Sequence, residues 1–177
     1  MKYNTKKTVL AAMFLSIGIV LPLLTGQIKE IGDTLLPMHL PVMLCGLVCG
    51  ANYGLVVGLV LPFLRSAIFS MPPMYPNAVW MALELATYGF VIGIIYSKFK
   101  NKTVKSVYIS LICAMLSGRI VWGISKAILL GLGGKVFGFA MFITGGFADA
   151  WLGIVLQLML IPLIMRFIDI ARKQGTQ

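Results

Sequence analysis

Long apolar segments separated by short polar loops run through almost all of this 177-residue chain. Hydrophobic residues make up 59% of it and charged residues only 11%, whereas a soluble domain has about 45–50% and about 25%. A soluble protein of this length could not form a polar surface around its core with so few charged residues. Lipid therefore has to cover the apolar surface. The sequence therefore predicts an all-α integral membrane protein in the lipid bilayer. Its length allows one domain, residues 1–177, with about six spans of roughly 20 residues.

The apolar runs place these helices at residues 8–24, 77–97, 107–131 and 147–168, with two short helices inside 38–69. The stretch 38–69 is too long for one span, and the turn-like residues 50–54 divide it. Three prolines within 71–76 exclude a continuous helix there. Residues 131–146 are rich in glycine and are expected to form a partly helical loop.

Lysine and arginine residues fix the expected orientation. With six helices and a cytoplasmic N-terminus, the inner segments hold ten basic residues and the outer loops hold two, Lys29 and Lys135. This asymmetry follows the positive-inside rule and predicts that both termini are cytoplasmic. The basic start of the chain resembles a signal peptide, but no small-residue cleavage pattern follows it. Residues 8–24 are therefore expected to be the first helix.

Four glycines recur at intervals of four, at Gly46, Gly50, Gly54 and Gly58. Small residues at this spacing allow helices to pack closely in a membrane. We assign that role to Gly46 and Gly58, and we expect Gly50 and Gly54 to bracket the turn.

Five ionisable residues lie inside the predicted spans, away from the basic ends: Arg65, Glu84, Arg119, Lys126 and Asp149. Each costs roughly 2.5–3.5 kcal/mol at a helix centre, so such residues usually face a cavity or pair with one another. The alternation of helix directions places all five in the outer half of the bundle, with His39 on the same side. Internal ion pairs would explain the charges but not why they are one-sided, whereas a site that collects a solute from outside explains both.

Helical spacing puts these charges on shared faces with aromatic residues. One stripe carries Asn77, Trp80, Glu84 and Tyr88, and another carries Arg119, Trp122 and Lys126. Polar groups interleaved with aromatic rings suit a flat organic ligand with polar edges, although tryptophans also form belts at membrane interfaces. The five charges sum to plus one, which favours a carboxylate or phosphate on the ligand and suggests pantothenate as one candidate.

Catalytic and nucleic-acid functions find no support in the sequence. The chain has one histidine, no zinc-ligand spacing, no serine or cysteine beside an evident base, and no phosphate-binding glycine loop. We therefore expect no enzyme activity, cofactor or metal site. Its net charge of +10 comes from basic residues at segment ends, so we expect no nucleic-acid partner. Cys45, Cys49 and Cys113 lie in apolar segments and are expected to be core residues.

Short motifs along the chain resemble one family of transport proteins. The matching segments are 12–16 (AMFLS), 38–42 (MHLPV), 46–58 around Asn52-Tyr53-Gly54, and 84–89 (ELATYG). Together with the six short helices and the basic N-terminus, they resemble the substrate-binding S components of energy-coupling-factor (ECF) vitamin transporters.

This resemblance implies that the chain binds a vitamin-like small molecule from outside, in the plasma membrane of a prokaryote. It also implies an ECF transmembrane coupling protein and two ATPase subunits as partners, with small residues of the first helix contacting the coupling protein. Ala12 and Ser16 occupy those positions here; packing inside the bundle is the alternative for them. Two other functions remain open, a small self-sufficient transporter or channel and a membrane-embedded enzyme.

Overall fold

In the computed structural model, which describes residues 5–25 and 34–174, all the regular secondary structure is helical. Five helices in these ranges are long and apolar enough to cross a bilayer. They are α1 (Thr5–Val20), which η1 (Leu21–Thr25) extends, α4 (Ala51–Phe69), α5 (Val79–Lys98), α6 (Val104–Leu132) and α8 (Trp151–Gln174). The all-α membrane bundle predicted from the sequence is thereby confirmed. The expected outer loop at 26–33, with Lys29, lies outside the described residues.

Residues 38–69 form a hairpin of two helices, as predicted. The first, α3 (His39–Cys49), has 11 residues and rises only about 16 Å, roughly half the hydrocarbon thickness. The break falls at Gly50, whose φ of 105° and ψ of 171° are readily adopted only by glycine. The chain then enters α4 at Ala51 without an intervening loop.

Glycines hold α3, α4 and α5 in close contact. A Cβ added at Gly46 would lie 2.4 Å from the carbonyl oxygen of Gly89, and one at Gly58 would lie 2.4 Å from that of Leu85. Gly54 also packs in this way, because a Cβ there would lie 2.5 Å from the same Gly89 oxygen. The expectation that Gly54 serves only the turn was therefore wrong, since α5 crosses the hairpin directly over it.

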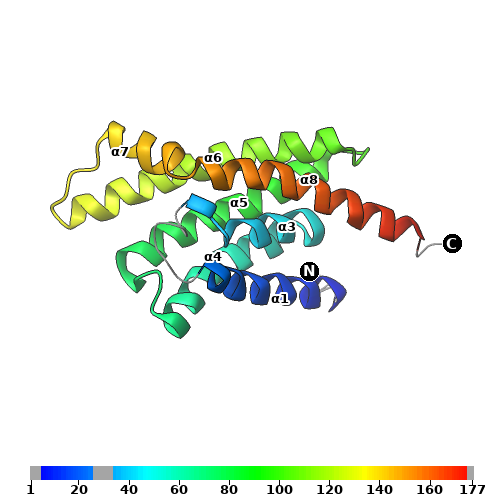
Figure 1. Ribbon diagram of the computed structural model, residues 1–177, viewed down its shortest axis with the longest axis horizontal. Helices are drawn as coiled ribbons and strands as arrows, with labels where there is room; N and C mark the ends of the chain where they lie inside the picture. The colour runs from blue at the N-terminus through cyan, green and yellow to red at the C-terminus, as the bar shows by residue number, and fades with distance from the viewer. Residues whose placement is uncertain (1–4, 26–33, 175–177) are drawn as a thin grey trace.

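The two ends of the bundle differ in how their helices are joined (Figure 1). The starts of α1 and α6 lie toward the same side as the ends of α5 and α8. Toward the other side, η2 (Met74–Ala78) leads into α5, and a segment with α7 (Phe139–Ile143) and η3 (Thr144–Ala148) joins α6 to α8. The partly helical loop predicted after residue 131 is confirmed.

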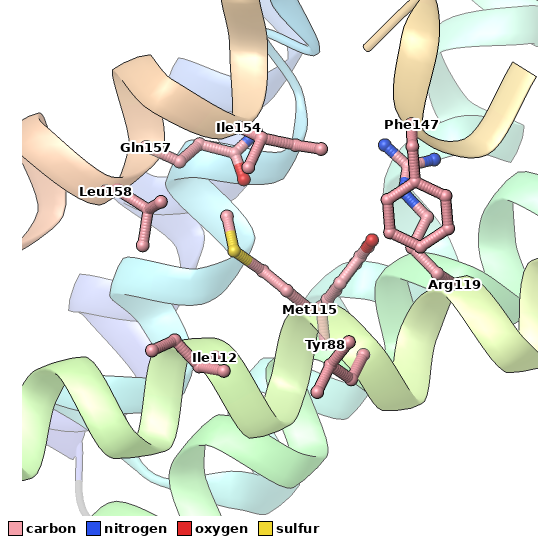
Figure 2. Close-up of a pocket in the computed structure, with 9 residues that line it drawn as sticks. Tyr88, Ile112, Met115, Arg119, Phe147, Ile154, Gln157 and Leu158 are labelled. Carbon is pink, nitrogen blue, oxygen red and sulfur yellow. The ribbon is translucent and has the colours of Figure 1, made fainter. Parts of the chain in front are cut away.

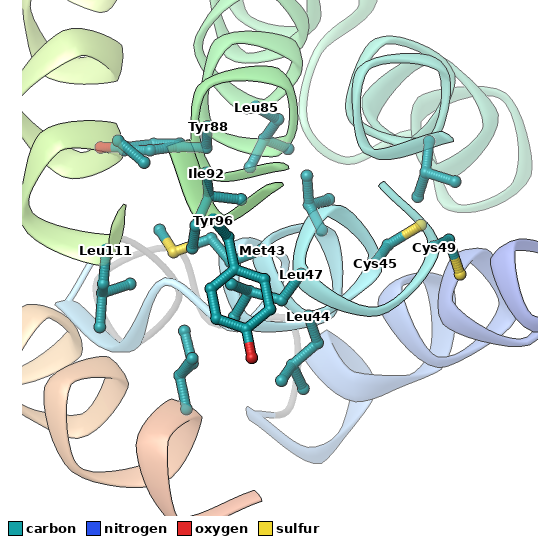
Figure 3. Packing of buried hydrophobic residues seen from close by; sticks show 14 of the residues in the cluster. Met43, Leu44, Cys45, Leu47, Cys49, Leu85, Tyr88, Ile92, Tyr96 and Leu111 are labelled. Carbon is teal, nitrogen blue, oxygen red and sulfur yellow. The ribbon is translucent and has the colours of Figure 1, made fainter. Parts of the chain in front are cut away.

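A buried apolar cluster fills the centre of the bundle (Figure 3). Leu85, Tyr88 and Ile92 of α5 point into it alongside Met43 and Leu47 of α3. The outer face is apolar as well, most regularly along α6, where exposed side chains recur every three or four residues. These are Ile109, Ile112, Leu116, Ile120, Ile124 and Ile128. A helix that is apolar on both its inner and outer faces suits a lipid environment.

Candidate functional site

A cavity of about 340 Å³ opens among α3, α5, α6 and η3, near the end of the bundle that carries η2 and α7. It falls within the usual range of small-molecule sites, about 300–1,000 Å³. It is lined by Leu36, His39, Asn77, Trp80, Met81, Glu84, Arg119, Trp122, Lys126, Gly145 and Asp149.

A buried polar network forms the floor of this cavity. One oxygen of Glu84, Oε1, accepts hydrogen bonds from Arg119 Nη1 at 3.0 Å and from the Tyr88 hydroxyl at 3.1 Å. His39 Nε2 lies 3.5 Å from the same oxygen, and the His39 ring meets the Tyr88 ring edge-on at 5.2 Å. Gly118 makes this arrangement possible, because any Cβ there would lie 2.6 Å from the Tyr88 ring.

The network leaves polar atoms available at the cavity. Arg119 Nη2 and His39 Nδ1 are buried and have no hydrogen-bond partner among the described residues. Buried polar groups in native proteins are almost always satisfied, so each of these atoms points to a bound molecule or to water. A guanidinium N–H donates to a carboxylate or carbonyl, and an imidazole nitrogen can donate or accept.

Aromatic rings line the wall above this floor and surround the ammonium group of Lys126. Its Nζ lies 4.4 Å from the centre of the Trp122 ring, and 5.5 Å from those of Trp80 and Phe137. Such distances are typical of cation–π contacts. Trp122 is held in turn by Phe137 and Phe142, with ring centres 5.9 and 6.1 Å away.

The structure gathers most of the predicted site residues into this one cavity. Eight of the ten line it directly: His39, Asn77, Trp80, Glu84, Arg119, Trp122, Lys126 and Asp149. Tyr88 lies behind the floor, where it bonds to Glu84. Trp80 and Trp122, for which an interfacial belt was the alternative, both contribute to the cavity wall.

Arg65 is not part of the cavity lining. Its Nε donates to the carbonyl of Met71 at 3.1 Å, its Nη1 donates to that of Ile19 at 3.3 Å, and its guanidinium lies 5.8 Å from the Phe69 ring. Arg65 therefore ties the loop after α4 to the end of α1. The sequence could not separate it from the other charges, because depth in the membrane does not specify direction around a helix.

Without Arg65 the charge balance of the site changes. Glu84 and Asp149 supply two negative charges, and Arg119 and Lys126 supply two positive charges. The excess of one positive charge that favoured an anionic ligand, and pantothenate among the candidates, does not exist at this cavity.

Two residues at or beside the cavity gave only a weak signal in the sequence. Gly145 lines the cavity, and Phe137 packs against Trp122 and Lys126. Both lie between α6 and α8, where glycine and aromatic residues show no helical period. A Cβ at Gly145 would lie 3.2 Å from the Trp122 ring, so the loop approaches this tryptophan closely. In residues 5–25 and 34–174, no three His, Cys, Asp or Glu side chains are grouped so that they could hold a metal ion.

Ala12 and Ser16 lie on the outer face of α1, away from the cavity. Both are exposed, whereas Ala11 and Gly18 turn into the bundle. The Ser16 hydroxyl donates to the carbonyl of Ala12 at 3.0 Å, so it presents no free donor to lipid. Larger apolar side chains flank the two small residues, Met13 and Ile17 among them.

Comparison with known proteins gives one clear result. A family model described as "ECF transporter, substrate-specific component" matches residues 6–168. Searches of curated proteins and of solved structures found no match.

Proposed function

The chain belongs to the substrate-specific components of ECF transporters, and from this premise we propose that it captures a vitamin or related micronutrient from outside the cell. The family is one of transporter subunits and not of enzymes. The cavity beneath η2 and η3 is the proposed site of capture, in the plasma membrane of a prokaryote.

One observation carries this proposal: the cavity combines a buried Glu84–Arg119 pair with donor groups that have no partner in the described part of the chain. A purely structural ion pair would be expected to satisfy all of its hydrogen bonds internally. Here the pair fixes the guanidinium while one of its nitrogens, Nη2, is left for another molecule. The rings of Trp80 and Trp122 offer flat surfaces above it.

These features describe a preferred substrate. Its polar edge would accept from Arg119 and contact His39, and a planar part would pack on the tryptophans. Because the cavity carries equal numbers of positive and negative charges, a neutral or zwitterionic molecule fits it better than a dianion such as a phosphate monoester, whose second charge would be desolvated without a partner.

We further propose that import requires an ECF coupling protein and two ATPase subunits, which α1 would contact through Ala12 and Ser16. Small exposed residues let another helix approach closely in the membrane.

Reconstitution in liposomes tests this function. Small molecules that co-purify with the protein are first identified by mass spectrometry. Their accumulation is then measured with and without the coupling protein, the ATPases and ATP. We expect uptake only from the complete assembly. Accumulation by the protein alone would instead identify a self-sufficient transporter.

A further inference from the structure

A second cavity, of about 200 Å³, lies between α6 and α8 beside the floor of the first (Figure 2). Its walls are mostly apolar, and Ile112 and Leu116, which are 48% and 53% exposed, leave it open toward the outer face of α6. The lining residues are Tyr88, Ile112, Met115, Leu116, Arg119, Phe147, Ile154, Gln157 and Leu158. Figure 2 shows Gln157 of α8 directed into the same space as Met115 of α6 and Tyr88 of α5.

Gln157 is the unusual residue of this cavity. It interrupts the apolar run of α8 and is only 1% exposed. Its Nε2 finds no hydrogen-bond partner within residues 5–25 and 34–174. The walls around it offer few polar partners to hold a water molecule, so an amide held in this position indicates that a bound molecule accepts from it.

The two cavities share a wall. Arg119 lines both, with Nη1 bonded to Glu84 and Nη2 without a partner in the described chain. The Tyr88 ring lines the second cavity while its hydroxyl bonds to Glu84 at the floor of the first. A molecule bound at Arg119 in the first cavity is therefore adjacent to the second.

We infer that the second cavity is an inner chamber of the substrate site, which takes an apolar arm of the substrate bearing one hydrogen-bond acceptor. Gln157 Nε2 donates to that acceptor, and Arg119 Nη2 holds a polar group where the two chambers meet. The arm is uncharged, because the only charged side chain of this chamber, Arg119, is already paired with Glu84. This assignment rests on the proposed function. A lipid tail could enter from the outer face of α6, but an acyl chain carries no acceptor for Gln157 Nε2, so we do not assign it as the intended occupant.

Photolabelling with two related probes tests the inner chamber. Benzophenone is an apolar ketone with a single acceptor, and 4-benzoylbenzamide adds an uncharged amide to one ring, whose carbonyl can accept from Arg119 Nη2. Under ultraviolet light the ketone takes a hydrogen atom from a nearby C–H group, and the two carbon radicals join, so peptide mass spectrometry locates the bound probe. Met159, which is 68% exposed on α8, reports the background of probe dissolved in detergent or lipid.

We expect 4-benzoylbenzamide to label Met115 several-fold more than Met159, and to do so more selectively than benzophenone, because its amide carbonyl accepts from Arg119 Nη2. Gln157→Leu should lower the ratio of Met115 to Met159 labelling about fivefold, as expected for the loss of one hydrogen bond. Val155→Leu, a change on the exposed face of α8, should leave the ratio unchanged. Gln157→Met provides a second test if the leucine variant does not fold.

Equal labelling of Met115 and Met159 would overturn the inner chamber. If the amide of the second probe does not raise the ratio, the connection of the chamber to Arg119 is overturned. If Gln157→Leu does not lower the ratio, the role of the Gln157 amide is overturned. The labelling needs neither ATPases nor transport. Transport without selective labelling therefore contradicts only the inner chamber, and labelling without ATP-driven uptake contradicts only the proposed function.

Discussion

At the scale of single residues, Glu84 determines how the site is arranged. Its Oε1 has Arg119, Tyr88 and His39 as neighbours from three different helices. The side chains of Glu84 and Arg119 are only 3% and 5% exposed, so their attraction is weakly screened. Because both side chains are buried, leaving either charge without the other would cost folding free energy.

Arg119→Ala is therefore expected to lower both stability and substrate binding. Removing one partner of a buried pair costs about 3–5 kcal/mol, because the other charge is left uncompensated. Thermal unfolding in detergent measures the first effect. Mass spectrometry of the co-purifying small molecule measures the second.

The double variant Arg119→Met with Glu84→Gln separates the two effects. It removes both charges, so we expect most of the lost stability to return while binding stays low. Normal binding by the double variant would mean that the pair serves the fold alone.

At the scale of helices, glycines decide how closely α5 crosses the α3–α4 hairpin. A Cβ added at Gly89 would lie 2.3 Å from the carbonyl oxygen of Gly54. The obstacle is backbone on both helices, so no side-chain rotation can relieve it. Trp80 and Glu84 are placed by the same helix that this contact holds, and Asn77 by η2, which leads into it.

Gly89→Ala should destabilise the protein by about 1–3 kcal/mol, the usual effect of overpacking. Gly131→Ala is the matched control, because no atom lies within 4 Å of a Cβ there. It should be neutral or stabilise α6 by up to about 1 kcal/mol. Equal melting temperatures for the two variants would refute the close contact.

The outer face of α1 can be tested independently of the cavity. Ala12→Trp should leave substrate binding by the isolated protein unchanged but block assembly with the coupling protein. Ile109→Trp, on the exposed face of α6, should permit both. Co-purification of the tagged subunits measures assembly, and loss of binding in Ala12→Trp would show that α1 acts on the cavity instead.

At the scale of the whole molecule, the charges are distributed along the membrane normal. The cavity and its four charged residues lie toward one end, and the basic loop between α5 and α6 lies at the other. Basic residues tend to stay on the cytoplasmic side, and on this ground we propose that the cavity faces outward.

Single cysteines at Pro73, Lys135 and Lys102 test this orientation, in a variant without the three native cysteines. A reagent that cannot cross the membrane should label positions 73 and 135 in intact cells and position 102 only after lysis. Labelling of position 102 in intact cells would mean that the protein has the opposite orientation in the membrane. Capture from outside would then have no basis.

The sequence by itself determined that this chain is a helical membrane bundle, where most helices lie, and that the charges within its apolar segments gather toward one end. These are local properties, because the length of an apolar run sets a span and the order of spans sets the depth of each residue. The break at Gly50 was predictable for the same reason, since it depends on the backbone of that residue.

Only the tertiary structure decided which of these residues meet. Arg65 lies near the same end of the bundle as the cavity but bonds to the carbonyls of Ile19 and Met71. Gly54 packs against Gly89 instead of serving only the turn, and Gln157 faces a cavity. Helical periodicity shows which residues share a face of one helix. The rotation of that helix against its neighbours depends on side chains far apart in the sequence, and close packing among several helices settles it.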